Sequence, residues 1–173
     1  MKMVYAMVVA ILTIFFGHQM ASAADQLGVL TLTNRNKSGE CQISIVRGYH
    51  AYQMDSTSCG DDNVYTFSLS GVKAGVEIKF CGHQYCKEDR GCGGWPNQPA
   101  CFVYKIRTLK RDSSVDQYPL TRLSGLALGY VPHKSFKMLQ VYDDEKIEGK
   151  LSRVEIKYCN AEDNCPDELQ SGQ

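Results

Sequence analysis

The chain has 173 residues, with 19 basic and 19 acidic side chains, so its formal net charge is zero at neutral pH. This balance argues against nucleic acid or an anionic membrane as the main partner, because both favour proteins rich in Lys and Arg. The length is typical of one domain and is sufficient for a buried core.

The first 23 residues have the pattern of an export signal. Lys2 precedes the apolar run VYAMVVAILTIFFG, and the segment ends in the small-x-small pattern Ala21-Ser22-Ala23. The run is too short for a typical membrane-spanning helix. We therefore expect cleavage after Ala23, leaving residues 24–173 as a single secreted or periplasmic domain without a membrane anchor. Lys2 is the only charge lost, which makes the net charge −1.

Apolar and polar residues alternate with a period of two along most of the remaining chain, and helical periodicity is weak. The alternating segments are 28–35, 42–46, 64–71, 76–80, 101–111, 136–142 and 152–159. Short strands separated by Gly, Asn, Asp and Ser predict an all-β fold, an antiparallel sandwich or barrel. Segment 112–135 predicts a surface connection with a short helix or an edge strand, and the C-terminal tail is polar.

All eight cysteines follow the export signal, which predicts a disulfide framework in an oxidising compartment. Their spacing suggests three groups, but eight cysteines allow on the order of a hundred pairings. The central group also brackets His83 and offers zinc ligands, although its uneven spacing favours disulfides. The absence of a Cys-x-x-Cys motif argues against redox catalysis. The three groups are Cys41 with Cys59, then Cys81, Cys86, Cys92 and Cys101, and finally Cys159 with Cys165.

Residues 61–86, DDNVYTFSLSGVKAGVEIKFCGHQYC, combine oxygen-bearing side chains, two alternating segments and a glycine turn. The segment resembles a βγ-crystallin motif, in which such a run leads into a strand, a turn and a strand ending in an aromatic residue. The match covers about 25 residues, and Phe67, Cys81 and Cys86 depart from the family pattern. The matching positions are Asp62, Asn63, Thr66, Leu69, Val72, Gly75, Val76, Ile78, Phe80 and Tyr85.

The resemblance implies a Greek-key β-sandwich, stapled in this chain by disulfides. It also implies a possible calcium site at Asp62, Asn63 and Thr66, because Ca²⁺ prefers carboxylate, amide and hydroxyl oxygens. The alternative is that these residues only initiate a turn. No other cofactor is expected.

Two aromatic segments are candidate binding elements. Trp95 lies in the Gly- and Pro-rich loop between Cys92 and Cys101, and a tethered aromatic loses little entropy on binding. The alternative is that Trp95 caps the core. The second segment, RGYHAYQ, contains Tyr49, His50 and Tyr52.

No recognised catalytic motif is present, neither Gly-x-Ser-x-Gly nor His-Glu-x-x-His, and no catalytic residue is assigned. We therefore predict a non-enzymatic protein-binding module of the inhibitor or immunity type, whose partner is another protein. Some βγ-crystallin-like exported proteins act as protease inhibitors or microbial toxins. The alternative is a secreted toxin, effector or small hydrolase whose site assembles only in three dimensions, with His50, His83 and His133 as the residues to test.

Overall fold

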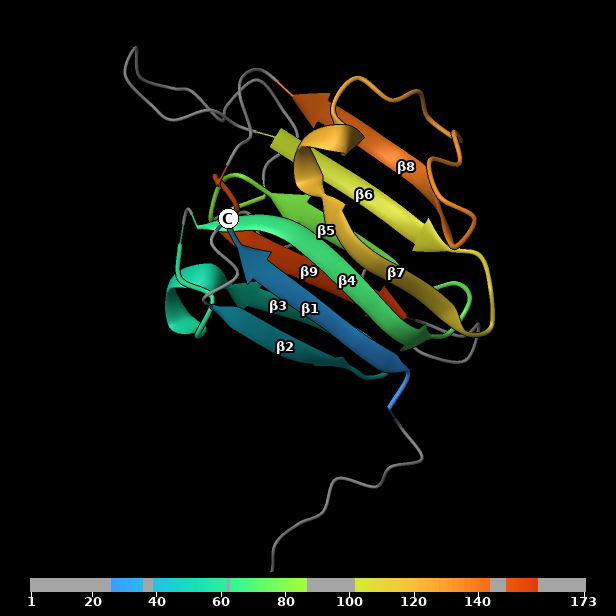
Figure 1. The fold of residues 1–173 in the computed structure, drawn as a ribbon, viewed down its shortest axis with the longest axis horizontal. Coiled ribbons are helices and arrows are strands. Elements are labelled where there is room, and N and C mark those ends of the chain that lie inside the picture. Colours follow the sequence, from blue (N-terminus) through green and yellow to red (C-terminus); the bar gives the residue numbers. More distant parts are fainter. Residues whose placement is uncertain (1–25, 36–38, 62, 87–101, 144–148, 159–173) are drawn as a thin grey trace, which may run out of the picture.

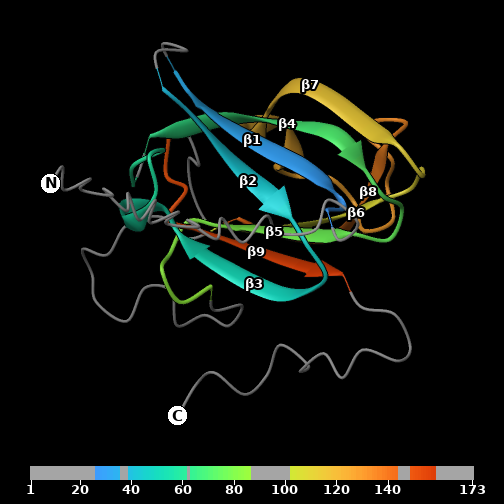
Figure 2. The same cartoon turned by 90° about the horizontal axis from the view of Figure 1, so that it is seen from below.

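The computed structural model describes residues 26–35, 39–61, 63–86, 102–143 and 149–158. These residues form two antiparallel sheets that pack face to face as a β-sandwich (Figure 1, Figure 2). The first, sheet A, has the strand order β2 (Glu40–Ile45), β1 (Gly28–Asn34), β4 (Val64–Val72), β7 (Ser113–Pro119). The second, sheet B, has the order β3 (Gly48–Gln53), β9 (Arg153–Tyr158), β5 (Glu77–Cys81), β6 (Phe102–Thr108), β8 (Phe136–Asp143).

The predicted all-β antiparallel fold is therefore confirmed, and each alternating segment contains a strand. Segment 112–135 contains the edge strand β7 and the short 3₁₀ helix η4 (Leu120–Leu123), as expected. Strand β3 was not predicted. It is an edge strand whose side chains are almost all half-buried, so its sequence lacks a clear alternation of apolar and polar residues.

The core lies between the two sheets and is filled by one face of each central strand. A fully buried large apolar side chain contributes roughly 1.5–3 kcal/mol to folding, so this face dominates the stability. The residues on the opposite face of sheet B point away from sheet A and include most of its charged side chains. The largest core side chains are Tyr104, Phe67, Phe80, Phe102 and Phe136, all at most 1% exposed.

The chain crosses from sheet A to sheet B between β4 and β5. Gly75 has φ +89°, and Thr108 of β6 holds the turn: its Oγ1 donates to the Lys73 carbonyl at 2.6 Å and accepts the Val76 N–H at 2.9 Å. Strands β4 and β5, the two strands within residues 61–86, therefore belong to different sheets. The Greek-key connectivity stays a prediction.

Two disulfides join segments close in the sequence. Cys41 on β2 bonds to Cys59, with Cα atoms 5.1 Å apart, and Cys81 at the end of β5 bonds to Cys86, with Cα atoms 5.2 Å apart. The first confirms the expected pair, and the second lies within the central group. Both are consistent with an oxidising environment. The segment up to Ala23 and the cysteines Cys92, Cys101, Cys159 and Cys165 lie outside the described residues.

Candidate binding site

Residues 81–86 form a tight turn that we call the corner. Cys81 and Cys86 are 0% and 6% exposed, and their disulfide closes the turn at its base. Inside it, the Cys86 N–H donates to the His83 carbonyl at 3.1 Å, and the Tyr85 N–H donates to His83 Nδ1 at 3.3 Å. Cys86 has φ +52°, a left-handed conformation that costs a non-glycine residue roughly 1–2 kcal/mol. The disulfide and the hydrogen bonds maintain this shape.

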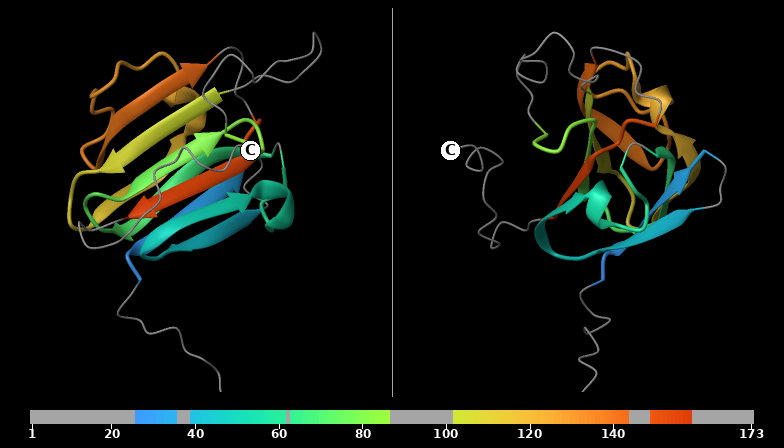
Figure 3. Two further views of the ribbon diagram at one scale, coloured as in Figure 1. Left: turned by 180° about the vertical axis from the view of Figure 1, so that it is seen from behind. Right: turned by 90° about the vertical axis from the view of Figure 1, so that its left-hand side faces the viewer.

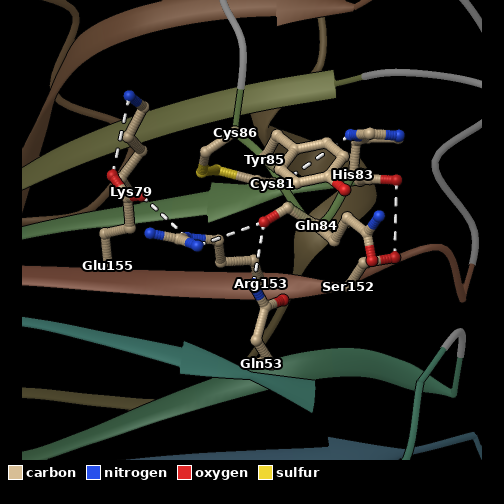
Figure 4. Close-up of a disulfide and its surroundings, with 11 residues drawn as sticks. Gln53, Lys79, Cys81, His83, Gln84, Tyr85, Cys86, Ser152, Arg153 and Glu155 are labelled. Atoms are coloured by element: carbon tan, nitrogen blue, oxygen red, sulfur yellow. Dashed lines mark hydrogen bonds and ion pairs between the residues drawn. A yellow bond between two sulfur atoms is a disulfide. The ribbon is translucent and has the colours of Figure 1, made fainter. Parts of the chain in front are cut away.

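Side chains of strands β3 and β9 form hydrogen bonds with the backbone of the corner (Figure 4). The Gln84 carbonyl accepts two hydrogen bonds, from Gln53 Nε2 at 2.9 Å and from Arg153 Nη1 at 3.2 Å. The Ser152 N–H donates to the Cys81 carbonyl at 2.9 Å. These groups come from positions far apart in the sequence, so the tertiary fold holds the corner in place.

The corner presents an aromatic side chain to solvent. Tyr85 is 62% exposed, and its ring lies 5.2 Å from the His83 ring, centroid to centroid. Beneath it, Cys81, Cys86 and Val103 form a small buried apolar cluster against which Tyr142 packs. The turn therefore has an apolar base and an exposed aromatic tip.

A polar pocket of about 170 Å³ opens beside the corner. Two carboxylates, an imidazole and two amides lie around it, and such groups suit a polar or basic group of a partner. The carboxylates come from the segment after β3 and from the segment after Cys59, which the first disulfide ties to β2. The lining residues are Gln53, Asp55, Asp61, Gly82, His83, Gln84 and Ser152.

A buried ion network lies next to the corner, on the face of sheet B that points away from sheet A. Lys79 and Glu155 are 4% and 7% exposed, and Lys79 Nζ lies 3.7 Å from Glu155 Oε2. Arg153 Nε donates to Glu155 Oε1 at 2.8 Å. Burial raises the pKa of the neighbouring Tyr49 hydroxyl above its usual value, an effect that its hydrogen bond with Arg153 partly opposes. Arg153 thus connects the network to the corner.

The structure separates Tyr49, His50 and Tyr52, the candidate binding residues that lie on β3. Neighbouring strand residues face opposite sides, so Tyr49 lies on the outward face of sheet B, whereas His50 and Tyr52 lie on the inward face. His50 Nε2 lies 2.8 Å from the Arg47 carbonyl, and Tyr52 packs against the core, where burial raises its pKa. These three residues do not form one surface. Trp95 lies outside the described residues.

The structure describes part of the expected calcium site. Asn63 is exposed before β4 and Thr66 is half-buried within it, while Asp62 lies outside the described residues. Among the residues that the structure describes, no three His, Cys, Asp or Glu side chains cluster as metal ligands. The calcium site stays a prediction.

Sequence reasoning did not identify the corner as a candidate binding element. Tyr85 entered only as a position of the resemblance, and Gln53, Gln84 and Arg153 were not singled out. The sequence feature that could have indicated this turn is the short separation of Cys81 and Cys86, which enclose polar and aromatic residues. A second exposed apolar group, Leu128, Tyr130 and Val131, was also missed; these side chains are 68%, 55% and 48% exposed.

Comparisons with family models, with curated proteins and with solved structures found no match to this chain. Within the described ranges, no helix has the length and apolar character needed to cross a bilayer.

Proposed function

We propose that the protein is a non-enzymatic, disulfide-stapled binding module that acts in a secreted or periplasmic compartment. It recognises another protein through the corner at residues 81–86, as an inhibitor or immunity protein does. The observation that carries this proposal is the exposed ring of Tyr85 on a turn held by a disulfide and by hydrogen bonds from two strands.

The rigidity of the corner favours recognition. A partner that docks on a preformed turn does not have to order it, and this ordering is a main cost of association. Exposed Tyr side chains are frequent hot spots because they add a large contact area with few rotatable bonds. The pocket beside Tyr85 offers polar groups that can fix the orientation of a partner.

Export supports the same proposal. The N-terminal segment has the composition of a signal peptide, and the two disulfides need an oxidising environment to persist. A compartment outside the cytosol would contain hydrolases or toxins that an inhibitor or immunity protein could bind.

Affinity capture with the processed protein tests the proposal. The bait is exposed to the exported protein fraction of the source, and saturable binding of the captured partner is then measured with purified components. We expect Tyr85→Ala to weaken binding at least about tenfold, which corresponds to about 1.4 kcal/mol. Tyr130→Ala is the matched control, since Tyr130 is 55% exposed elsewhere, and should change the affinity less than about twofold. Equal effects of the two variants, or no saturable partner, would refute the proposal.

A hydrolase is the second candidate, because the pocket brings His83 close to two carboxylates, Asp55 and Asp61. An imidazole beside carboxylates is a common acid–base arrangement. His83→Ala would then abolish hydrolysis or toxicity while the melting temperature stays the same. Full activity in this variant would exclude an essential role of His83.

A further inference from the structure

The outer strands of the two sheets differ in how well their free edges are protected. Strands β2 and β3 lie at one side of the sandwich, and β7 and β8 lie at the opposite side (Figure 3, right). The free edge of β8 is partly occupied, because the Gly129 N–H donates to the Met138 carbonyl and the Met138 N–H donates to the Tyr130 carbonyl, each at 2.9 Å. Strand β7 is irregular: its register with β4 shifts twice, Gln117 has φ +38°, and the strand ends at Pro119. Irregular backbone, proline and covering segments keep an edge from pairing with another chain.

Strand β2 is regular. Its six residues pair with β1 without a break in register, and they include neither proline nor lysine. Among the residues that the structure describes, only β1 and Leu27 form hydrogen bonds with its backbone. Alternate residues of an edge strand direct their N–H and C=O groups away from the sheet. Strand β2 therefore presents a row of donors and acceptors at the free edge of sheet A.

This edge is held in place and has a defined register. The disulfide from Cys41 to Cys59 ties β2 to the segment that follows β3. The side chains of β2 alternate strictly, so a strand added in the wrong register would move its buried residues to solvent. Strand β3 has no such alternation. The buried residues of β2 are Cys41, Ile43 and Ile45, and the exposed ones are Glu40, Gln42 and Ser44.

We infer that the free edge of β2 binds the same edge of a second copy of this chain. The two β2 strands pair antiparallel about a two-fold axis at Ile43, so that the two copies of sheet A form one continuous sheet. Two-fold symmetric dimers are the commonest assemblies of identical chains. The inference goes beyond the proposed function, because the corner begins at the end of β5 in sheet B.

The charges of this segment are complementary in the antiparallel arrangement. Residues 40–47 contain two charged side chains, Glu40 at the start of β2 and the exposed Arg47 just after its end. Antiparallel pairing brings Glu40 of each copy to the end where the other copy carries Arg47, so opposite charges meet twice. Between the ends, the uncharged Gln42 lies opposite Ser44, and Ile43 lies opposite its own counterpart. A parallel pairing would place like charges side by side.

Sedimentation equilibrium of the processed protein, from micromolar to millimolar concentration, tests the inference. We expect a reversible equilibrium between monomer and dimer, because an edge-to-edge contact is small. Gln42→Lys with Ser44→Lys should raise the dissociation constant of the dimer at least about tenfold, since the new positive charges face each other across the two-fold axis. Ser44→Lys alone is the second variant if the pair does not fold, and we expect an increase of about threefold from it.

A matched control adds the same charge to the same sheet. Ser70 and Ser114 are exposed residues of β4 and β7, away from the β2 edge. Ser70→Lys with Ser114→Lys should change the dissociation constant of the dimer less than about twofold. Urea unfolding of both double variants shows whether each is folded under the conditions of the measurement.

A charge exchange tests the direction of the strands. Glu40→Arg alone and Arg47→Glu alone should each raise the dissociation constant about threefold or more, because each variant places like charges at both ends of the pair. An equimolar mixture of the two variants should dimerise as tightly as the wild type, since each copy then meets an opposite charge at both ends. In a parallel pairing, the single variants would dimerise as well as the wild type, and the mixture would dimerise better.

Several outcomes would overturn the inference: a protein that stays monomeric, equal effects of the two lysine pairs, or no recovery in the mixture. If the protein stays monomeric and the lysine exchanges on β2 abolish binding of a captured protein, that protein occupies the edge in place of a second copy, and the inference fails. Tyr85→Ala should leave the dimer unchanged, so the inference and the proposed function can fail separately.

Discussion

The rings of Phe67 and Phe80 lie 5.0 Å apart, centroid to centroid, with their planes inclined by 35°. Phe67 belongs to β4 of sheet A, and Phe80 belongs to β5 of sheet B, directly before Cys81. This contact therefore joins the two sheets at the strand that carries the corner. Phe67 also lies against Tyr118 and Phe136, with centroid distances of 5.6 Å and 5.8 Å.

We expect Phe67→Ala and Phe80→Ala each to lower the free energy of unfolding by about 3–5 kcal/mol, because each leaves a cavity in a fully buried cluster. Since the two rings touch, the double variant should differ from the sum of the single effects by about 0.5–3 kcal/mol. Urea unfolding of the four proteins measures both quantities. Additive effects would show that the ring contact contributes nothing of its own.

The two disulfides should affect different properties. The link between Cys41 and Cys59 spans 18 positions and that between Cys81 and Cys86 spans five, so chain entropy gives about 3 and about 2 kcal/mol of stabilisation, respectively. We expect Cys41→Ala/Cys59→Ala to be the less stable variant and Cys81→Ala/Cys86→Ala to lose more affinity for the proposed protein partner. Chemical unfolding and binding assays of both variants test this expectation, which the reverse order would contradict.

Removing Glu155 should cost more stability than removing Glu77. Glu155 is 7% exposed and contacts the buried Lys79 and the half-buried Arg153, so Glu155→Gln removes a buried charge that pairs with both cations and should cost about 3–5 kcal/mol. Glu77 pairs with Arg107, whose side chain is 42% exposed, and Glu77→Gln should cost less than about 1 kcal/mol. The two variants have the same charge change, and urea unfolding compares them. Similar losses would contradict the role assigned to burial.

His133 should make the stability depend on pH. Burial, with Lys134 and Lys110 nearby, lowers the pKa of the His133 imidazole below its usual value, and its Nδ1 accepts the Ser135 N–H at 3.2 Å. In the window below about pH 6.5, the unfolded state therefore binds more protons than the folded state, so stability falls as the pH is lowered.

His133→Gln removes this titrating group and should flatten the pH dependence between about pH 7 and the folded-state pKa of His133. Urea unfolding across this range, for the wild type and the variant, measures the difference. An NMR titration of the His133 ring provides the direct check. A pKa above that of free histidine would contradict the assignment.

Calcium tests the resemblance to βγ-crystallins. If Asp62, Asn63 and Thr66 hold Ca²⁺, an excess of about 100 times the dissociation constant should stabilise the fold by about 2.7 kcal/mol. Asn63→Ala should remove that gain without changing the melting temperature in a chelator. A melting temperature of the wild type that does not respond to millimolar calcium would contradict the predicted site.

The amino-acid sequence alone was enough to predict the antiparallel strands and to group Cys41 with Cys59 by their spacing, while the structure supplied the bond between them. Both depend on local information: a side-chain period of two, and two cysteines on a short stretch of chain. The edge strand β3 escaped prediction because its half-buried residues do not alternate.

Only the tertiary structure placed Gln53 and Arg153 on the carbonyl of Gln84, across 31 and 69 positions of sequence. It also put Tyr49 and Tyr52 on opposite sides of sheet B. Such contacts depend on the order and register of distant strands. Many pairings satisfy the same alternation of apolar and polar residues, so packing of the whole core decides among them.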